Sequence, residues 1–162
     1  SYASATEAVQ ISLAISGAQD TGSAGSDTLI DIEGLIGSAF NDTLTGNNQD
    51  NIIEGGDGND NLFGGGGHDT LSYLGALNAV TVDLAATGRF DTQGAGSDRF
   101  SGFEGLLGSA FNDTLKGPSG ANTLNGASGN DVLEGRGGND ILIGGAGTDT
   151  MTGGNGSDVF QY

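Results

Sequence analysis

Ten aspartates of this chain share one position of a nine-residue repeat. They are Asp27, Asp42, Asp60, Asp69, Asp98, Asp113, Asp131, Asp140, Asp149 and Asp158, each at the sixth position of its nonapeptide. Carboxylates beside glycine-rich turns that expose backbone carbonyls supply hard oxygen ligands, and calcium accepts about six to eight of these in flexible geometry. Magnesium requires a stricter octahedron, and zinc and copper prefer His or Cys, of which the chain has one and none. The spacing therefore predicts calcium binding.

Apolar residues follow the same nine-residue period. Tandem nonapeptides begin at Gly37, Gly46, Gly55 and Gly64, and again at Gly108, Gly117, Gly126, Gly135, Gly144 and Gly153, with isolated copies at Gly22 and Gln93. The eighth position is large and apolar in every copy: Leu29, Leu44, Ile53, Leu62, Leu71, Phe100, Leu115, Leu124, Leu133, Leu142, Met151 and Phe160. A polar, glycine-rich turn followed by one apolar residue between two variable ones is typical of a very short strand with one inward side chain.

Two nonapeptides therefore form a coil of eighteen residues with a strand on each side. Stacking such coils at the strand spacing of about 4.8 Å buries the eighth-position residues in a thin ladder. Parallel strands joined in this way wind right-handed. The predicted fold is all-β, a right-handed parallel β-roll or β-solenoid with calcium bound between glycine-rich turns.

A longer repeat is superimposed on the short one. The eight residues from Gly37 to Leu44 recur unchanged 71 positions later, whereas Tyr162 follows its counterpart Tyr73 by 89 positions, so the second unit carries one additional coil. We predict one continuous solenoid of two units. The first, 1–78, has wider coils over 8–36 and nonapeptides over 37–72; the second, 79–162, has wider coils over 79–107 and nonapeptides over 108–161.

Nonapeptides two apart should lie on the same edge of the solenoid, which places their sixth-position side chains about 5 Å apart. The two complete predicted pairs are Asp131 with Asp149 and Asp140 with Asp158. Asp42 with Asp60 and Asp113 with Asp131 are less regular, because Phe40 and Phe111 replace the fourth glycine of their turns. Glycine carbonyls complete the predicted ligand set: Gly55, Gly64, Gly126, Gly135, Gly144 and Gly153. Asn51, Asn122, Asp27 and Asp98 are predicted as weaker ligands, with Asn51 opposite Asp69 and Asn122 opposite Asp140.

The charge of the chain fits this interpretation. There are 21 acidic residues against four basic ones, for a formal net charge of −17. Such a chain repels nucleic acid and anionic membranes, and no stretch is apolar enough to insert into a bilayer. Low hydrophobicity with high charge means either disorder or neutralisation of the carboxylates on folding. The ceiling of about six calcium ions would bring the net charge to about −5, an ordinary value for a soluble domain.

The nonapeptides resemble a known family. Gly55 to Phe63 (GGDGNDNLF) and Gly144 to Thr152 (GGAGTDTMT) match the repeats-in-toxin (RTX, haemolysin-type) pattern G-G-x-G-x-D-x-U-x. The resemblance implies a parallel β-roll, calcium between its turns, and export by type I secretion, as in secreted adhesins, toxins and enzymes. We therefore expect a secreted, extracellular module that is associated with the cell surface in some settings, a monomeric piece of a longer chain.

Three classes of function stay open at this point. The favoured one is a calcium-binding module that folds outside the cell and serves secretion, stability and spacing. The second is a calcium-dependent polysaccharide- or surface-binding module of an adhesin or a polysaccharide-processing enzyme. Ice binding fits poorly, because the outward threonine array is interrupted. We expect no catalytic activity, since Asp83, Glu33 and Glu104 are isolated carboxylates, His68 occupies a variable turn position, and no nucleophile–base or cofactor motif is present.

Overall fold

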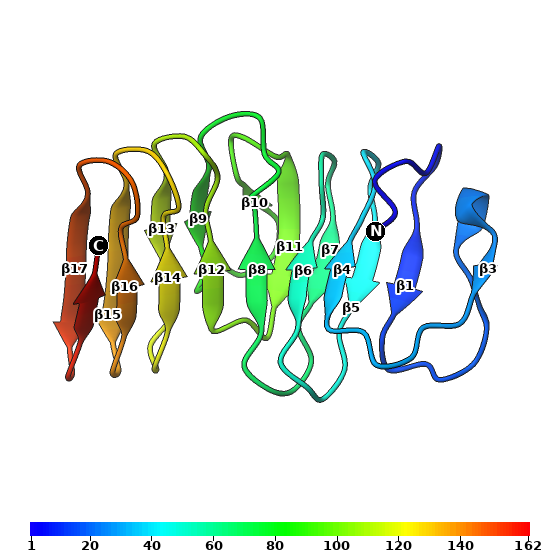
Figure 1. Ribbon diagram of the computed structural model, residues 1–162, viewed down its shortest axis with the longest axis horizontal. Helices are drawn as coiled ribbons and strands as arrows, with labels where there is room; N and C mark the ends of the chain where they lie inside the picture. Colours follow the sequence, from blue (N-terminus) through cyan, green and yellow to red (C-terminus); the bar gives the residue numbers. More distant parts are fainter.

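The computed structural model describes residues 1–162 and consists of short strands stacked along one axis (Figure 1). The first unit contains β1 (Gln10–Ser12), β2 (Gln19–Asp20), β3 (Ser26–Asp27), β4 (Gly34–Ile36), β5 (Thr43–Thr45), β6 (Ile52–Glu54), β7 (Asn61–Phe63) and β8 (Thr70–Ser72), with a 3-10 turn, η1, at Gly22–Ala24. The second contains β9 (Thr81–Asp83), β10 (Phe90–Asp91), β11 (Ser97–Ser101), β12 (Gly105–Leu107), β13 (Thr114–Lys116), β14 (Thr123–Asn125), β15 (Val132–Gly137), β16 (Ile141–Ile143), β17 (Thr150–Asn155) and β18 (Val159–Gln161). No helix is of the length and hydropathy needed to cross a bilayer.

One side of the stack is a single sheet that passes through both units. Its seven strands follow the order β18-β16-β14-β12-β8-β6-β4, and every neighbouring pair is parallel. The opposite side is divided into two sheets, β1-β5-β7-β11-β10 and β17-β15-β13-β9. The predicted all-β parallel β-roll is confirmed.

The core is the ladder of eighth-position side chains. Leu44, Ile53, Leu62 and Leu71 in the first unit, and Leu115, Leu124, Leu133 and Leu142 in the second, have no exposed surface. Each three-residue strand turns its middle side chain inward and its two neighbours outward, as the pleat requires. Because one large side chain per strand fills the interior, the hydrophobic core is only one ladder wide on each side.

The segments that open the two units contain more than a coil. Each of them contains a short antiparallel hairpin, β2 with β3 and β10 with β11. The chain leaves β8, begins the second sheet at β9, and then returns so that β11 pairs with β7 of the first unit. This return joins the two units, because β11 and β12 of the second unit lie directly on β7 and β8 of the first.

Candidate metal centre

The predicted pairs of sixth-position residues are stacked in the structure. In each pair the backbone N–H of the earlier residue donates a hydrogen bond of 2.7–3.0 Å to Oδ1 of the residue eighteen positions later. The pairs are Asp42–Asp60, Asn51–Asp69, Asp113–Asp131, Asn122–Asp140, Asp131–Asp149 and Asp140–Asp158. One carboxylate oxygen is thus used to hold the turns in register, and the second is left for another partner.

That second oxygen has no partner in the chain. Oδ2 of Asp60, Asp69, Asp131 and Asp140 is buried and accepts no hydrogen bond. A buried carboxylate oxygen without a partner is costly, and each one in a native protein requires an explanation such as a bound ion or water. These oxygens therefore indicate a ligand that the protein chain itself does not supply.

A backbone carbonyl approaches the same place from the next turn. A β-carbon added to Gly126 would lie 2.2 Å from Oδ2 of Asp131 and 2.8 Å from the carbonyl oxygen of Gly144. A β-carbon added to Gly135 would likewise lie 2.3 Å from Oδ2 of Asp140 and 2.8 Å from the carbonyl oxygen of Gly153. Only glycine lets the aspartate and the next turn come this close, so a carboxylate oxygen and a carbonyl oxygen meet at each of these two turns.

Three of the other four predicted glycine carbonyls also lie against the neighbouring turn, and only that of Gly135 does not appear among the nearest atoms around Gly117. The carbonyl oxygens of Gly55, Gly64 and Gly126 lie 2.4, 2.0 and 3.1 Å from β-carbons added to Gly37, Gly46 and Gly108, respectively. No three carboxylate, imidazole or thiolate side chains converge anywhere in the structure. A cation held between turns would therefore be bound by one or two aspartates together with backbone carbonyls, an all-oxygen set that suits calcium.

Burial changes the proton affinity of these carboxylates. Desolvation is the main cause that raises the pKa of Asp60 to about 7 and the pKa values of Asp98 and Asp131 to about 6. The pKa of Asp69 is also raised, by burial first and then by the nearby charges of Glu104 and Asp50. In the metal-free chain Asp60 therefore keeps its proton up to about pH 7, and Asp98 and Asp131 keep theirs up to about pH 6. A bound cation would stabilise the charged form of these carboxylates.

Asp42 and Asp113, predicted as ligands of less regular sites, already have partners. The Ser109 N–H donates to Oδ2 of Asp113, its hydroxyl donates to Oδ1 at 2.8 Å, and the Val80 N–H donates to Oδ1 at 2.8 Å. Ser38 and Val9 make the same contacts with Asp42. Both oxygens of each carboxylate thus accept hydrogen bonds within the chain, so Asp42 and Asp113 depend less on an external partner than the aspartates whose Oδ2 has none.

We expect Ser109→Ala to destabilise the protein without changing the number of calcium ions bound. The variant loses the hydroxyl that donates to Asp113 and that accepts the Phe111 N–H at 3.1 Å. The loss should cost about 1–3 kcal/mol of unfolding free energy. Urea unfolding in calcium measures it. Ser128→Ala, at an exposed turn position of the same edge, is the control and should stay within about 0.5 kcal/mol of the parent.

The two turns with asparagine at the sixth position are closed by that side chain. The Asn122 amide nitrogen donates to the carbonyl oxygens of Pro118 and Gly120 and to Oδ1 of Asp140. In the other turn, Oδ1 of Asn51 accepts the Asn47 N–H at 2.7 Å, and its amide nitrogen is buried without an acceptor. An N–H donor occupies each turn where an oxygen ligand would be needed, which gives the physical reason for predicting weaker sites here.

The structure brings together two further acidic pairs where the two units meet. The Asp60 N–H donates to Oδ1 of Asp98 at 2.9 Å, and Tyr73 donates its hydroxyl to Oδ2 of Asp98. The Asp69 N–H donates to Glu104 at 3.2 Å, so Glu104 is not isolated as expected. No repeat in the sequence indicates these contacts, which join residues 38 and 35 positions apart. Asp27, the counterpart of Asp98, lies at the end of the stack, where Tyr2 and Thr21 donate to it.

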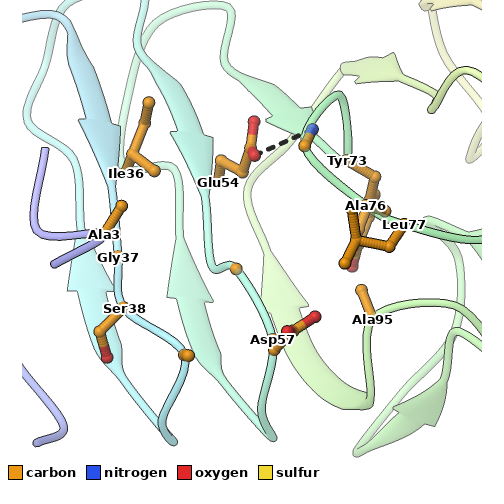
Figure 2. A pocket seen from close by; sticks show the side chains of 13 residues that line it. Ala3, Ile36, Gly37, Ser38, Glu54, Asp57, Tyr73, Ala76, Leu77 and Ala95 are labelled. Carbon is orange, nitrogen blue, oxygen red and sulfur yellow. Dashed lines mark hydrogen bonds between the residues drawn. The ribbon is translucent and has the colours of Figure 1, made fainter. Parts of the chain in front are cut away.

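Two other features lie outside the aspartate ladder. Asp83, expected to be isolated, forms an ion pair of 2.6 Å with Arg136. A hollow of about 290 Å³ lies between the N-terminal segment and residues 73–77 (Figure 2). Glu54 and Asp57 line it, and the Glu54 carboxylate accepts the Gly75 N–H at its rim (Figure 2). The hollow contains no lysine or arginine.

Comparison with known families gives one match. The RTX calcium-binding nonapeptide repeat, in a pattern of four copies, matches residues 36–71, 106–133 and 126–160, which together make up more than half of the chain. A comparison with curated proteins gives no match. The matched segments contain all four aspartates whose Oδ2 atoms lack a partner.

Proposed function

Because the chain belongs to the family of RTX calcium-binding nonapeptide repeats, we propose that it is a calcium-binding module of a larger secreted protein that folds when calcium binds outside the cell. Its roles would be to assist secretion by the type I route, to stabilise the folded protein and to act as a spacer. The proposal assigns it no catalytic activity.

The observation that carries this proposal is the set of buried, unpartnered Oδ2 atoms of Asp60, Asp69, Asp131 and Asp140. At the turns of Asp131 and Asp140, the carbonyl oxygen of a glycine in the next turn lies close to the same first-position glycine as Oδ2. Carboxylate and carbonyl oxygens are the ligands that calcium prefers in proteins. When bound there, calcium would supply positive charge to a chain of net charge −17.

Coupling between calcium and folding follows from the same residues. In the absence of a cation, stacking the turns buries carboxylates without partners, and the one-ladder core adds little to offset that cost. Extracellular calcium modules typically have dissociation constants of about 10⁻⁴–10⁻³ M. At that affinity the chain would be metal-free and unfolded in a cytosol, and it would fold only after export.

A calcium titration of the metal-free protein tests the proposal. Circular dichroism should show little β-structure in excess chelator and a cooperative gain of it as calcium is added, with isothermal titration calorimetry reporting the ions bound. Magnesium at the same concentration should be much less effective, because its octahedron is stricter. A full β signal in excess chelator would refute calcium-coupled folding.

A matched pair of variants locates the calcium. Asp131→Asn should weaken calcium binding by on the order of tenfold or more, since it removes a charged oxygen that the ladder places between Asp113 and Asp149. Asp57→Asn makes the same chemical change at an exposed turn position and should bind like the parent. Equal losses in both variants would mean that net charge, and not the buried ladder, controls binding.

The second candidate is calcium-dependent binding of a polysaccharide or a cell surface. The hollow in Figure 2 is the place to look for it, but its polar lining is acidic, and an anionic polymer would be repelled there. A glycan array probed in calcium distinguishes the two, since only the second candidate predicts a bound glycan.

A further inference from the structure

The two ends of the solenoid carry strands with one unpaired edge. At one end β17 and β18 have strand partners on one side only. Toward the other end β4 is the last strand of its sheet, and β3, which pairs only with β2, lies outermost (Figure 1). Inside the molecule the corresponding strands are joined, because β7 pairs with β11 and β8 pairs with β12. The junction between the two units therefore shows what each open end can bind.

The correspondence holds residue by residue. The strands β17 and β18 follow β7 and β8 by 89 residues, and β3 and β4 precede β11 and β12 by 71 residues. At the internal junction Phe100 lies opposite Leu62, and Leu106 lies opposite Leu71. The same register at the ends places Leu29 opposite Met151 and Leu35 opposite Phe160.

Side chains that the internal junction buries are exposed at the ends. Phe160 is 45% exposed, whereas its counterpart Leu71 has no exposed surface. At the other end, Ile32 is 37% exposed and its counterpart Phe103 only 4%. Apolar surface is thus left open on two faces whose counterparts cover one another.

The hydrogen-bond groups of the ends are complementary as well. Oδ1 of Asp98 accepts the Asp60 N–H across the junction. At the open ends, Asp27 corresponds to the acceptor Asp98, and Asp149 corresponds to the donor Asp60. Asp27 already accepts the Tyr2 hydroxyl on Oδ2 at 3.0 Å, as Asp98 accepts that of Tyr73 at 2.9 Å, and its Oδ1 remains available.

We propose that the β17–β18 end is a docking surface for the β3–β4 end of a second copy of this unit, in the register of the internal junction. The copy continues the same polypeptide, with Tyr162 in the place of its Tyr2. A separate molecule is the poorer occupant, because its own Tyr2 already donates its backbone N–H to Ile36 at 2.8 Å and would compete with Tyr162. The contact is head-to-tail, so it can repeat along one axis.

A fusion protein in which Tyr162 is followed directly by residues 3–162 of a second copy tests this surface. The internal junction has two positive charges, Arg89 and Arg99, whereas the open end has Ala18 and Thr28 at the corresponding positions. All measurements therefore need excess calcium to supply positive charge near the aspartates. In the single copy the Tyr162 side chain is fully available (96% exposed), whereas Tyr73 at the internal junction is 3% exposed. Nitration of Tyr162, followed by mass spectrometry, should therefore slow by on the order of tenfold or more in the fusion.

The two copies should also unfold in one transition, as coupled neighbours in a solenoid do. Nitration of Tyr162 at the rate of the single copy, with two independent transitions, would overturn the proposal. So would head-to-tail association of unfused copies, since it would assign the surface to separate molecules. Calcium binding per copy is measured in parallel. A fusion or single copy that binds no calcium would contradict the proposed function and would leave the docking surface to be judged from the nitration result.

Two substitutions in the first copy separate docking from folding. Phe160→Asp places a charge on the inward side of the docking surface and should restore nitration of Tyr162 in the fusion. It should change the single copy little, since Phe160 lies in the terminal strand. Val159→Asp, 49% exposed on the neighbouring outward position, adds the same charge and should leave Tyr162 protected. Equal effects of the two variants would exclude the proposed register.

Discussion

Replacing Gly129 with alanine is expected to lower the free energy of unfolding by about 2–6 kcal/mol, because overpacking costs about 1–3 kcal/mol and a strained backbone about 1–3 kcal/mol more. Gly129 is the fourth residue of its turn and has φ +130, a conformation that side-chain-bearing residues rarely adopt. An added β-carbon would also lie 2.3 Å from the carbonyl oxygen and 2.6 Å from the carbonyl carbon of Phe111, one turn below. Because backbone cannot rotate away as a side chain can, the stack itself would have to open.

Two other glycines separate the causes of this loss. Gly120 has φ +134 but nothing within 4 Å of an added β-carbon, so Gly120→Ala should show backbone strain alone, about 1–3 kcal/mol. Gly137 has open space and no positive φ, so Gly137→Ala should be neutral or stabilising by up to about 1 kcal/mol. Urea unfolding in excess calcium ranks the three. Equal losses at Gly129 and Gly120 would show that turn-to-turn contact does not limit the packing.

Backbone contact between neighbouring turns also explains how much of the aspartate ladder could be predicted from the sequence. A nine-residue period with glycine at the first and fourth positions requires that turns approach backbone to backbone, so alternate nonapeptides must stack. The stacking of Asp131 on Asp149 and of Asp140 on Asp158 follows from counting along the sequence, and the structure places both pairs as expected.

The less regular turns show what counting could not predict. Phe40 and Phe111 replace the fourth glycine, and neither has positive φ, so their turns have another shape. In that shape Ser38 and Ser109 reach the aspartate and fill the role of an external partner. Nothing in the period distinguishes an aspartate held by a serine from one left for a cation, because both occupy the sixth position.

The junction between the units was unpredictable for a different reason. Glu104 lies beside Asp69 only because the chain passes through β9 and β10 before it returns to the first unit. That path depends on an antiparallel hairpin with only two pairs of facing residues, Phe90 with Asp98 and Asp91 with Ser97. Such short pairings leave no periodic pattern in a sequence, so the partner of Asp69 had to be observed.

In excess chelator, acidification from about pH 7.5 to about pH 5 is expected to make the metal-free chain more ordered. The raised pKa values of Asp60, Asp98 and Asp131, at about 7, 6 and 6, mean that the folded state binds more protons in this range than the unfolded state, whose aspartates titrate near 4. Stability from these groups is therefore fully present below about pH 4 and is lost as pH rises through 6 to 7.

Circular dichroism and urea unfolding at the two pH values measure this effect, and Asp60→Asn provides the matched variant. The amide stays neutral at both values, so the variant should lose the part of the pH dependence that Asp60 contributes. Asp83 does not interfere: burial opposes the shift, but the hydrogen bond and charge of Arg136 lower its pKa, so its titration lies below the tested range. Metal-free stability that rises with pH between these values would contradict the burial of protonated aspartates.

The same protons set the pH dependence of calcium binding with the opposite sign. A calcium ion at the Asp131 or Asp60 carboxylate must displace the proton that burial favours, so the apparent affinity should fall as pH drops through about 7 to 6. Titration calorimetry in two buffers of different ionisation enthalpy measures the protons released, which should be close to zero well above pH 7 and should increase toward pH 6. Acid would thus replace calcium as the partner of the same buried oxygens, and the ladder would respond to both ions through one set of atoms.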